Sequence, residues 1–342
     1  LNSFKPLLSI ILKLHMSKSI LTKKILYWYD NNKRKLPWRK KISQAKKEYY
    51  TLISEFMLQQ TQVAIVIPYF NSFVKDIPNI SSLAKINENK LLKYWEGLGY
   101  YSRVKNLKKT AVIVEQNFNG SLPNTIDELK TLPGIGDYTA NAIMAIAFNE
   151  PFIPLDGNIE RVIKRLLFLK STKETSKENL IKKKKIFGTS LRSSDYAQAL
   201  MELGALVCRP KNPLCNQCPL IKNCKSFKKN DFEIVKKIVK KIDKFYLINI
   251  YKKDKKFLLI KNIKFNFLKN LRIFPMRKIS KFDNTDKTLN FKMSNMNMSV
   301  VFKFTKLKNN IPGSSWIDSS KLESYTLPTF TKKIFRYLDK IK

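Results

Sequence analysis

The sequence has 342 residues, of which 44% are hydrophobic and 12% aromatic; this is enough to build cores in about two domains and excludes a chain that is disordered throughout. It carries 66 Lys and Arg against 26 Asp and Glu, which gives a net charge of +40. No apolar run approaches the ~20 residues of a membrane span, and the excess of positive charge indicates a polyanionic partner, with nucleic acid before an anionic membrane surface.

Histidine and glycine are both scarce in the sequence, and this limits the chemistry that the chain can perform. The single histidine is His15, which precedes Met16, a more typical start for a chain; an over-extended start and a short targeting peptide are both compatible with this segment. Histidine catalysis and histidine-based zinc sites are therefore not expected. Only nine glycines occur, with neither a dinucleotide fingerprint nor a P-loop motif, so catalysis is left to carboxylates or to a lysine that forms a Schiff base.

The spacing of apolar residues predicts amphipathic helices first and strands later. The expected helices span residues 20–31, 48–60, 63–74, 88–96, 103–117, 124–132, 137–148, 158–169 and 195–205. After a lysine-rich connector at 226–243, the expected strands span 244–251, 256–261 and 298–305, and a last helix spans 327–340. The sequence therefore predicts a multidomain protein with an all-helical domain followed by an α+β domain.

Glu55 lies in the middle of the second predicted helix, among Leu52, Ile53, Phe56 and Leu58. Burial among these neighbours would raise the pKa of its carboxyl group, as a general acid requires. A solvent-facing position on the helix is the alternative interpretation.

A glycine-containing turn, LPGIG at 132–136, lies between two predicted helices in a stretch without Lys or Arg from Thr131 to Glu160. Gly134 and Gly136 allow a close approach of the backbone, and the free N–H groups of the following helix could hold a DNA phosphate. An ordinary turn between helices is the alternative. Downstream, Asp156 directly precedes a predicted helix, where an N-cap is the common role of Asp.

The four cysteines of the chain are Cys208, Cys215, Cys218 and Cys224, with the spacing C-x6-C-x2-C-x5-C. No further cysteine is present to pair with them, so a site with four thiolate ligands for a metal is predicted rather than disulfides. The spacing is compatible with both a zinc ion and a [4Fe–4S] cluster. Because four protein thiolates leave no open coordination position, we expect a structural role.

Taken in order, these motifs resemble the adenine DNA glycosylase family, which belongs to the iron–sulfur DNA glycosylases with a helix–hairpin–helix. The resemblance is dense from about Lys18 to Cys224, and MLQQTQV favours this family over the endonuclease III enzymes. The matching stretches are LPWR (36–39), SEFMLQQTQVAIVIPYF (54–70), WEGLGYYSRVKNL (95–107), LPGIGDYTANAI (132–143), PLDGNIERV (154–162), ALMELGALVC (199–208) and the cysteine tail.

The resemblance implies an enzyme of base excision repair that flips adenine, mispaired with 8-oxoguanine or guanine, out of the duplex and hydrolyses its N-glycosidic bond. Glu55 matches the general acid, and Asp156 matches the carboxylate that stabilises the oxocarbenium-like sugar. The other matching positions are Tyr138 and Asn158, which support these carboxylates, Trp38, Arg39 and Glu202 in the adenine pocket, and Gln60 and Tyr100 in the wedge that fills the stack.

Further expectations follow from the same resemblance. The cofactor would be a [4Fe–4S] cluster on the four cysteines, and the partner would be double-stranded DNA with A:8-oxoguanine or A:G mispairs. The protein is expected to be a cytoplasmic monomer that does not bind membranes. The bifunctional relatives have a lysine where this chain has Tyr138, so we expect a monofunctional glycosylase without strong strand cleavage.

The resemblance also divides the chain into domains. A helical glycosylase domain is expected at 16–225, with a six-helix barrel module at about 36–148 and an iron–sulfur module formed by 16–35 and 149–225. A linker at 226–243 and a Nudix-like lesion-recognition domain at 244–342 would follow.

The C-terminal part departs from the family pattern. With Gly313 as its only glycine and with few acidic residues, this part is not expected to hydrolyse nucleotides. The family's Phe-Ser-His loop is expected at 293–295, where Ser294 and Asn295 would contact 8-oxoguanine with reduced discrimination against guanine. A different alignment of the loop is the alternative.

Two other functions remain open at this point. One is a bifunctional glycosylase and lyase of the endonuclease III type, acting on oxidised pyrimidines; Tyr138 and the additional domain argue against it. The other is a DNA-binding helix–hairpin–helix module without catalysis, which the two carboxylates at matching positions disfavour.

Overall fold

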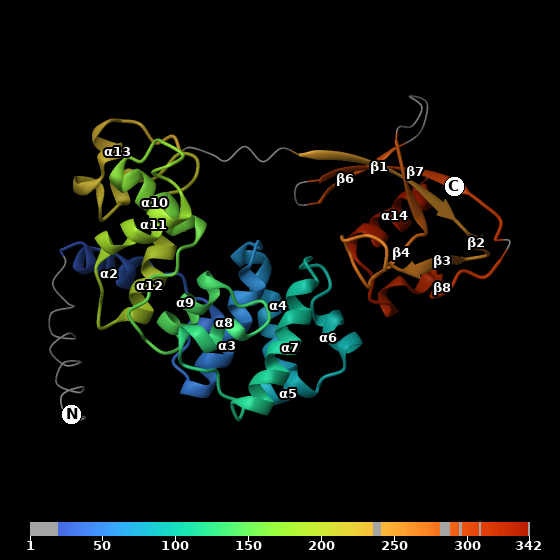
Figure 1. Ribbon diagram of the computed structural model, residues 1–342, viewed down its shortest axis with the longest axis horizontal. Coiled ribbons are helices and arrows are strands. Elements are labelled where there is room, and N and C mark those ends of the chain that lie inside the picture. The colour runs from blue at the N-terminus through green and yellow to red at the C-terminus, as the bar shows by residue number, and fades with distance from the viewer. Residues whose placement is uncertain (1–19, 235–240, 281–287, 294–295, 308, 341–342) are drawn as a thin grey trace. The chain divides into compact units, whose positions relative to one another are not determined.

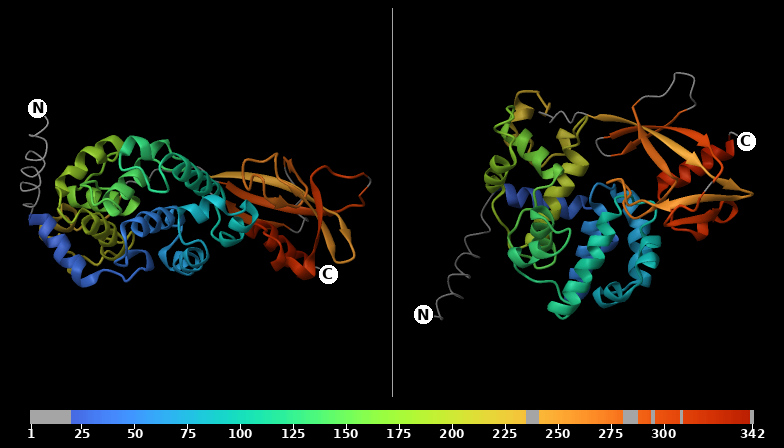
Figure 2. Two further views of the ribbon diagram at one scale, coloured as in Figure 1. Left: turned by 90° about the horizontal axis from the view of Figure 1, so that it is seen from below. Right: turned by 45° about the vertical axis from the view of Figure 1, so that its right-hand side comes forward.

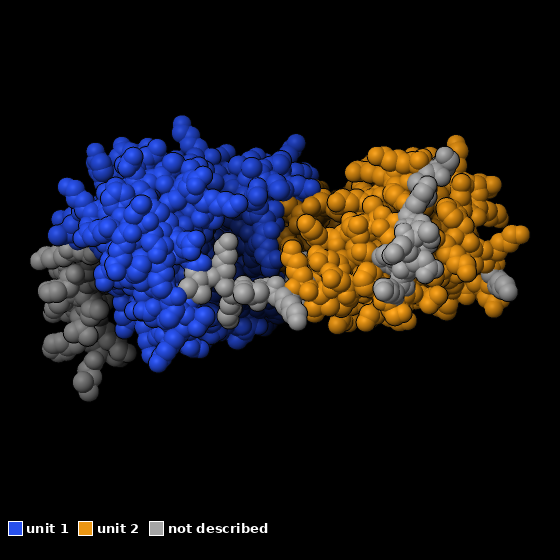
Figure 3. Space-filling view, turned by 90° about the horizontal axis from the view of Figure 1, so that it is seen from above, with its two compact units in different colours: residues 1–86, 105–236 blue, residues 87–104, 237–342 orange. Residues whose placement is uncertain are grey.

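The structure is a computed structural model that describes residues 20–234, 241–280, 288–293, 296–307 and 309–340 (Figure 1). Helices make up the blue-to-yellow part of the chain, and the strands lie in its orange-to-red part, as both views of Figure 2 show. The chain forms two compact units, residues 1–86 with 105–236 and residues 87–104 with 237–342 (Figure 3). The expected helical part and a separate part that contains the sheets are therefore confirmed. Among the described residues, no helix is long and apolar enough to cross a membrane.

The first unit consists of helices joined by short connections. Its elements are α2 (Ile20–Asn32), η1 (Pro37–Arg39), α3 (Gln44–Leu58), α4 (Val63–Asp76), α5 (Ile80–Lys85), most of α7 (Ser102–Asn117), α8 (Ile126–Thr131), α9 (Asp137–Ile146), α10 (Gly157–Leu167), α11 (Lys177–Lys183), η2 (Lys184–Phe187), α12 (Ser193–Glu202), η3 (Leu203–Val207), η4 (Cys215–Gln217), η5 (Ile221–Asn223) and α13 (Lys225–Lys228).

Helix α10 shows how the sequence sets one of these elements. It begins where the Asp156 side chain accepts a hydrogen bond from the N–H of Ile159, at 2.7 Å, which satisfies a donor that the first turn of a helix leaves unpaired. It ends at Phe168, which adopts a left-handed conformation. Its apolar residues recur every three or four positions, and this buried face packs in one core with residues of α2 and α12.

The predicted helices are all found, with shifted ends. The short helices α5, α11 and α13 were not predicted, whereas the equally short α6 and α8 were. The expected helix at 195–205 ends as α12 at Glu202 and continues as a π-helical turn, Leu203–Val207. Gly204 lies in this turn directly against Asn158, where a Cβ atom would come within 2.6 Å of the Asn158 Cβ.

The second unit combines a short helical segment with two small sheets. Its elements are α6 (Glu88–Tyr94), the start of α7, β1 (Ile242–Ile250), β2 (Lys252–Lys253), β3 (Lys256–Lys261), β4 (Arg272–Ile273), β5 (Met276–Ile279), β6 (Leu289–Met293), β7 (Met296–Phe304), β8 (Ser314–Asp318), η6 (Ser319–Ser324) and α14 (Thr329–Lys340).

The strands of this unit form two four-stranded sheets. One has the order β5-β1-β7-β6, in which β1 and β7 are parallel and the other pairs antiparallel. The other has the order β2-β3-β4, with β8 paired to β3. Strands β4, β5, β6 and β8 were not predicted, because runs of two to five residues carry little pattern. Helix α14 buries Ile334, Phe335 and Leu338 in the core that both sheets share.

Glu96 joins the helical segment of this unit to its C-terminal part. The Glu96 carboxylate accepts a hydrogen bond from the backbone N–H of Leu327 at 3.3 Å and pairs with Lys332 of α14 at 2.8 Å. Lys93 reaches the backbone oxygen of Glu323 in the same region. The end of α6 and the segment that follows it are thus attached to the region of η6 and α14 through polar contacts.

Candidate active site

A cavity of about 1060 Å³ opens within the first unit. It is lined by η1, the end of α3 and the turn that follows, the start of α9, the start of α10, and α12. The predicted site residues that line it are Trp38, Arg39, Glu55, Gln60, Gly134, Gly136, Tyr138, Asp156, Asn158 and Glu202. Both candidate carboxylates therefore open onto the same cavity, although a hundred residues of chain lie between them.

Glu55 is buried rather than solvent-facing, with 5% of its surface exposed. The pKa of its carboxyl group is raised to about 7, mainly by burial. A hydrogen bond with the Tyr138 hydroxyl and the charge of Arg39 lower it, and the nearby Asp156 contributes to the rise. At neutral pH this carboxyl group is thus close to half protonated. A group in this state can give a proton to a ligand in the cavity.

Asp156 caps helix α10 and also faces the cavity. Besides the N–H of Ile159, its carboxylate accepts a hydrogen bond from the Asn158 amide at 2.8 Å. Burial raises the pKa of Asp156 from its usual range, while these hydrogen bonds oppose the rise. The capping role and a role in the site are compatible, because one carboxylate oxygen caps the helix and the other receives the amide.

Arg161 connects this pair of residues to the cysteine-containing loop. Its guanidinium donates to the Asn158 side-chain oxygen at 2.7 Å, to the Gly204 carbonyl at 2.7 Å and to the Cys208 carbonyl at 2.6 Å. Asn158 is therefore oriented from one side by Arg161 and in turn orients Asp156. Sequence reasoning missed Arg161, although it lies within the quoted motif PLDGNIERV.

Glu202 also lines the cavity, and 1% of its surface is exposed. Arg34 binds its carboxylate in a bidentate manner, at 2.6 and 2.9 Å, and Arg39 donates to it at 3.0 Å. Burial alone would raise the pKa of Glu202, but the bonds from Arg34 and the charge of Arg39 outweigh it and hold the pKa below the usual value. Arg34 was missed because it lies in the run KRK, which is typical of a solvated surface.

Arg39 also carries a donor that the described residues leave unpaired. Its Nε atom is buried in the described structure without a hydrogen-bond partner, while the guanidinium lies along the cavity wall. A buried, unpaired N–H is costly.

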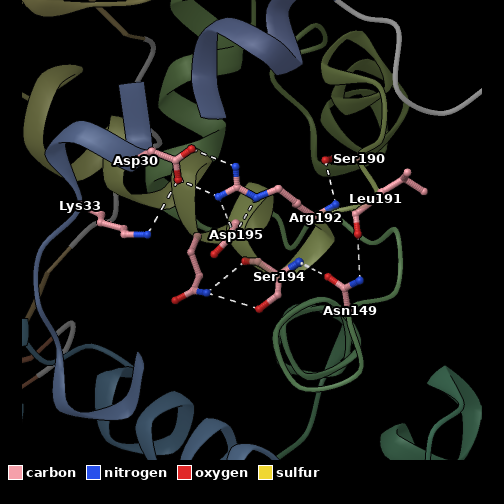
Figure 4. Close-up of polar contacts among 9 residues, drawn as sticks. Asp30, Lys33, Asn149, Ser190, Leu191, Arg192, Ser194 and Asp195 are labelled. Atoms are coloured by element: carbon pink, nitrogen blue, oxygen red, sulfur yellow. Dashed lines mark hydrogen bonds and ion pairs between the residues drawn. The ribbon is translucent and has the colours of Figure 1, made fainter. Parts of the chain in front are cut away.

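A surface cluster of ion pairs connects the end of α2 to the start of α12 (Figure 4). Arg192 binds both carboxylate oxygens of Asp30, at 2.9 and 2.6 Å, and also pairs with Asp195 at 2.7 Å. Exposed ion pairs contribute little individually, and the buried core that α2 and α12 share, with Trp28 and Leu200, accounts for more of their association.

The glycines of the hairpin between α8 and α9 have different structural roles. Gly134 has a φ of +84°, and a Cβ atom there would come within 2.9 Å of Phe56 and Asn106. Gly136 is the N-cap of α9 and has open space around it. Glycine is therefore required at 134 by conformation and packing, whereas at 136 it leaves the backbone open to approach from outside.

The two wedge residues lie on different units. Gln60 follows α3 in a left-handed conformation, with a φ of +57°, and lines the cavity. Tyr100 also has a positive φ, +47°, and is exposed on the segment 87–104 of the second unit. The expected lesion-recognition residues Ser294 and Asn295 lie outside the described residues, between Met293 of β6 and its register partner Met296 of β7.

The four cysteines are not bonded to one another and line one small cavity of about 30 Å³. No three Cys, His, Asp or Glu side chains among the described residues lie close enough together to hold a single metal ion. Arg165 fastens the surrounding loop, donating to the Arg209 and Pro210 carbonyls and approaching the Cys208 sulfur at 3.5 Å. Burial raises the pKa of the Cys218 thiol to about 12, so this side chain is neutral unless a bound cation stabilises the thiolate.

Comparisons with known proteins agree on the helical part of the chain. A family model described as HhH-GPD superfamily base excision DNA repair protein matches residues 53–185. An adenine DNA glycosylase of Buchnera aphidicola subsp. Baizongia pistaciae is 42% identical over 244 residues, which are 69% of this chain and 68% of that protein. The one of Buchnera aphidicola subsp. Schizaphis graminum is 35% identical over 288 residues, 82% of this chain and 80% of that protein. The solved structure of a thermostable thymine-DNA glycosylase matches with a TM-score of 0.54 and 25% identity, over 61% of this chain and 96% of that one.

Proposed function

The chain belongs to the adenine DNA glycosylase family, and on that premise we propose that the cavity of the first unit binds an adenine flipped out of duplex DNA and releases it. The observation that carries this proposal is the meeting of Glu55, Tyr138 and Asp156 in a single cavity, with a pKa of about 7 at Glu55. The chain is a DNA glycosylase of base excision repair. The mispairs that it processes are proposed to be A:8-oxoguanine and A:G.

In the proposed mechanism, Glu55 donates its proton to the adenine, which makes the base a better leaving group. The Asp156 carboxylate, held by Asn158 and the N–H of Ile159, stabilises the positive charge that develops on the sugar as the N-glycosidic bond breaks. Water then adds to the sugar and gives its proton to the Glu55 carboxylate, which leaves an abasic site and restores the acid. The Tyr138 hydroxyl orients Glu55 through their hydrogen bond.

We assign recognition of the adenine to the part of the cavity that Glu202, Arg39 and Trp38 line. We propose that the Glu202 carboxylate accepts hydrogen bonds from the exocyclic amine and that the Arg39 guanidinium, which lines the cavity, donates to a ring nitrogen. Arg34 keeps Glu202 ionised, so Glu202 acts as an acceptor only. Trp38 lines the same cavity and supplies an aromatic face for the base.

The bifunctional alternative is not favoured. A lyase of that type needs an amine that attacks the sugar, whereas this chain has Tyr138 at the matching position in the cavity, and a phenol forms no Schiff base. We propose a monofunctional enzyme that leaves the strand intact until alkali is added.

DNA is the partner, and the net charge of +40 provides attraction to its backbone. We propose that the backbone N–H groups at Gly134 and Gly136 hold a phosphate at the start of α9. Gln60 and Tyr100 would enter the base stack from their left-handed turns. A monomer located in the cytoplasm is the proposed working form.

For the cysteine site we propose a [4Fe–4S] cluster held by Cys208, Cys215, Cys218 and Cys224. The thiols surround a common cavity, yet no three are placed for a single ion. The choice of a cluster over a zinc ion rests on the resemblance to the iron–sulfur DNA glycosylases. When bound, the cluster would crosslink the loop that carries these residues.

The two sheets and α14 of the second unit support a Nudix-like domain, which we propose for residues 244–342, after a helical domain at 16–225 and a linker at 226–243. Within the helical domain, the barrel module at about 36–148 and the iron–sulfur module of 16–35 and 149–225 are proposed on the same basis. Recognition of 8-oxoguanine by Ser294 and Asn295 is part of this proposal. Replacing Asn295 by His should increase discrimination between 8-oxoguanine and guanine; no change would contradict the assignment.

The function is tested with labelled duplexes that carry either A:8-oxoguanine or thymine glycol, analysed with and without alkali. We expect the adenine strand to break only after alkali, and Glu55→Gln to abolish this product. Nicking at thymine glycol without alkali would instead establish the bifunctional alternative. The absence of any released base would leave a DNA-binding module.

A further inference from the structure

The segment between α6 and α7 presents Tyr100 from an unusual backbone. Gly97, Gly99 and Tyr100 all have positive φ angles, of +104°, +69° and +47°. Glycine adopts such angles freely, but a tyrosine adopts them only when its surroundings enforce them. With 45% of its surface exposed, Tyr100 has little burial of its own to hold it in place.

Arg103, in the first turn of α7, supplies contacts that can enforce this backbone. Its guanidinium donates from Nη2 to the carbonyl oxygens of Leu98, at 2.9 Å, and Gly99, at 3.1 Å. The Trp95 indole N–H donates to the same Gly99 oxygen at 3.2 Å. The two peptide groups that directly precede Tyr100 are thus bound to side chains on either side of the turn.

The same guanidinium lies between two aromatic rings. Its Cζ atom is 5.4 Å from the ring centroid of Tyr100 and 5.4 Å from that of Trp95, which is within the range of a cation–π interaction. Arg103 itself is 7% exposed, and its burial lowers its pKa to about 10, so it remains charged at neutral pH. A buried cation therefore supports an exposed aromatic ring.

We propose that Arg103 is a positioning residue for the wedge: it fixes the peptides of Leu98 and Gly99 so that the Tyr100 ring is set for the base opposite the adenine before DNA binds. The inference rests on the proposed function and deepens it, because it assigns opposite-base discrimination to a residue that is itself buried. The planar guanidinium can donate to these oxygens while it lies by the Trp95 and Tyr100 rings, which the ammonium group of lysine does less well.

The test is a double-mutant cycle on the full-length protein. Arg103→Met, Tyr100→Ala and the double variant are compared by single-turnover adenine release from duplexes with 8-oxoguanine or guanine opposite the adenine. We expect Arg103→Met to lower the ratio of the rate with 8-oxoguanine to the rate with guanine by about tenfold or more, as expected for loss of charged hydrogen bonds. When Tyr100 is already alanine, Arg103→Met should have no further effect on this ratio. Arg103→Lys should restore part of the ratio.

Two further measurements separate positioning from a general loss of stability. Lys109→Met removes the same charge from an exposed site on α7 and should leave the ratio unchanged. A 2-aminopurine placed beside the adenine brightens when the stack opens; at saturating enzyme, Arg103→Met should reduce this signal. If Arg103→Met does not fold, Arg103→Lys carries the same cycle.

Additive effects of the two substitutions on the ratio would overturn the proposal, as would a fall in thermal stability with an unchanged ratio. A Tyr100→Ala variant that keeps the wild-type ratio would overturn it too, while leaving adenine release intact. Failure of the wild-type protein to release adenine from either duplex is a different result, because it refutes the proposed function itself.

Discussion

Replacing Glu55 by Gln should stabilise the protein, and should do so more as the pH rises. The folded protein raises the pKa of this carboxyl group from 4.5 to about 7. Between these two values the folded chain retains a proton that the unfolded chain has already released, so stability falls as the pH increases. The full penalty above pH 7 is about 3 kcal/mol, at 1.36 kcal/mol for each pH unit of the difference.

Glutamine has nearly the same shape and no proton to lose, so Glu55→Gln should avoid this penalty. Between about pH 5 and pH 8, the stability difference between the variant and the wild type should grow by about 2 to 3 kcal/mol. For a domain of about 200 residues this corresponds to a rise of about 5–10 °C in the difference between their melting temperatures. Thermal unfolding followed by circular dichroism at the two pH values measures it.

Glu150→Gln is the control, because it removes a carboxylate from an exposed position and should give no such pH-dependent gain. If the melting temperatures of Glu55→Gln and the wild type changed by the same amount across this pH range, the reasoning would be refuted. Glu55 would then not keep its proton through burial. We expect Glu55→Gln to gain stability and to lose adenine release. In the wild type, the buried acid lowers stability but is needed for function.

The remaining predictions concern the same cavity. The single-turnover rate of adenine release should fall about tenfold for each pH unit above 7, because only the protonated Glu55 can act as the acid; a flat profile from pH 7 to 9 would contradict this assignment. Gly204→Ala should cost about 1–3 kcal/mol and slow adenine release, because the new Cβ would lie 2.6 Å from Asn158; Gly157→Ala, which meets no atom within 4 Å, is its control in both assays. Arg34→Met should destabilise the protein by about 3 kcal/mol, because it leaves the buried Glu202 with Arg39 as its remaining arginine partner. An unchanged denaturation midpoint would show that Arg34 is not needed to stabilise the buried Glu202.

The sequence by itself determined the helical and strand-containing parts of the chain and their order. Long helices such as α10 carry a periodic apolar face and a capping Asp, both of which depend only on neighbouring residues. Short elements such as α5 and β4 could not be predicted, because they form where the rest of the fold leaves a place for them.

The motifs also indicated which residue types could perform chemistry, since the chain has one histidine and few glycines. Burial and partners could not be read from them. Only the folded chain brings Glu55 and Asp156 to one cavity, and only desolvation there gives Glu55 a pKa of about 7. In the sequence, Arg34 in a basic run and Arg103 in a helix look like solvated cations. The tertiary structure distinguishes them, because it places the Glu202 carboxylate within hydrogen-bonding distance of Arg34 and the turn carbonyls within hydrogen-bonding distance of Arg103.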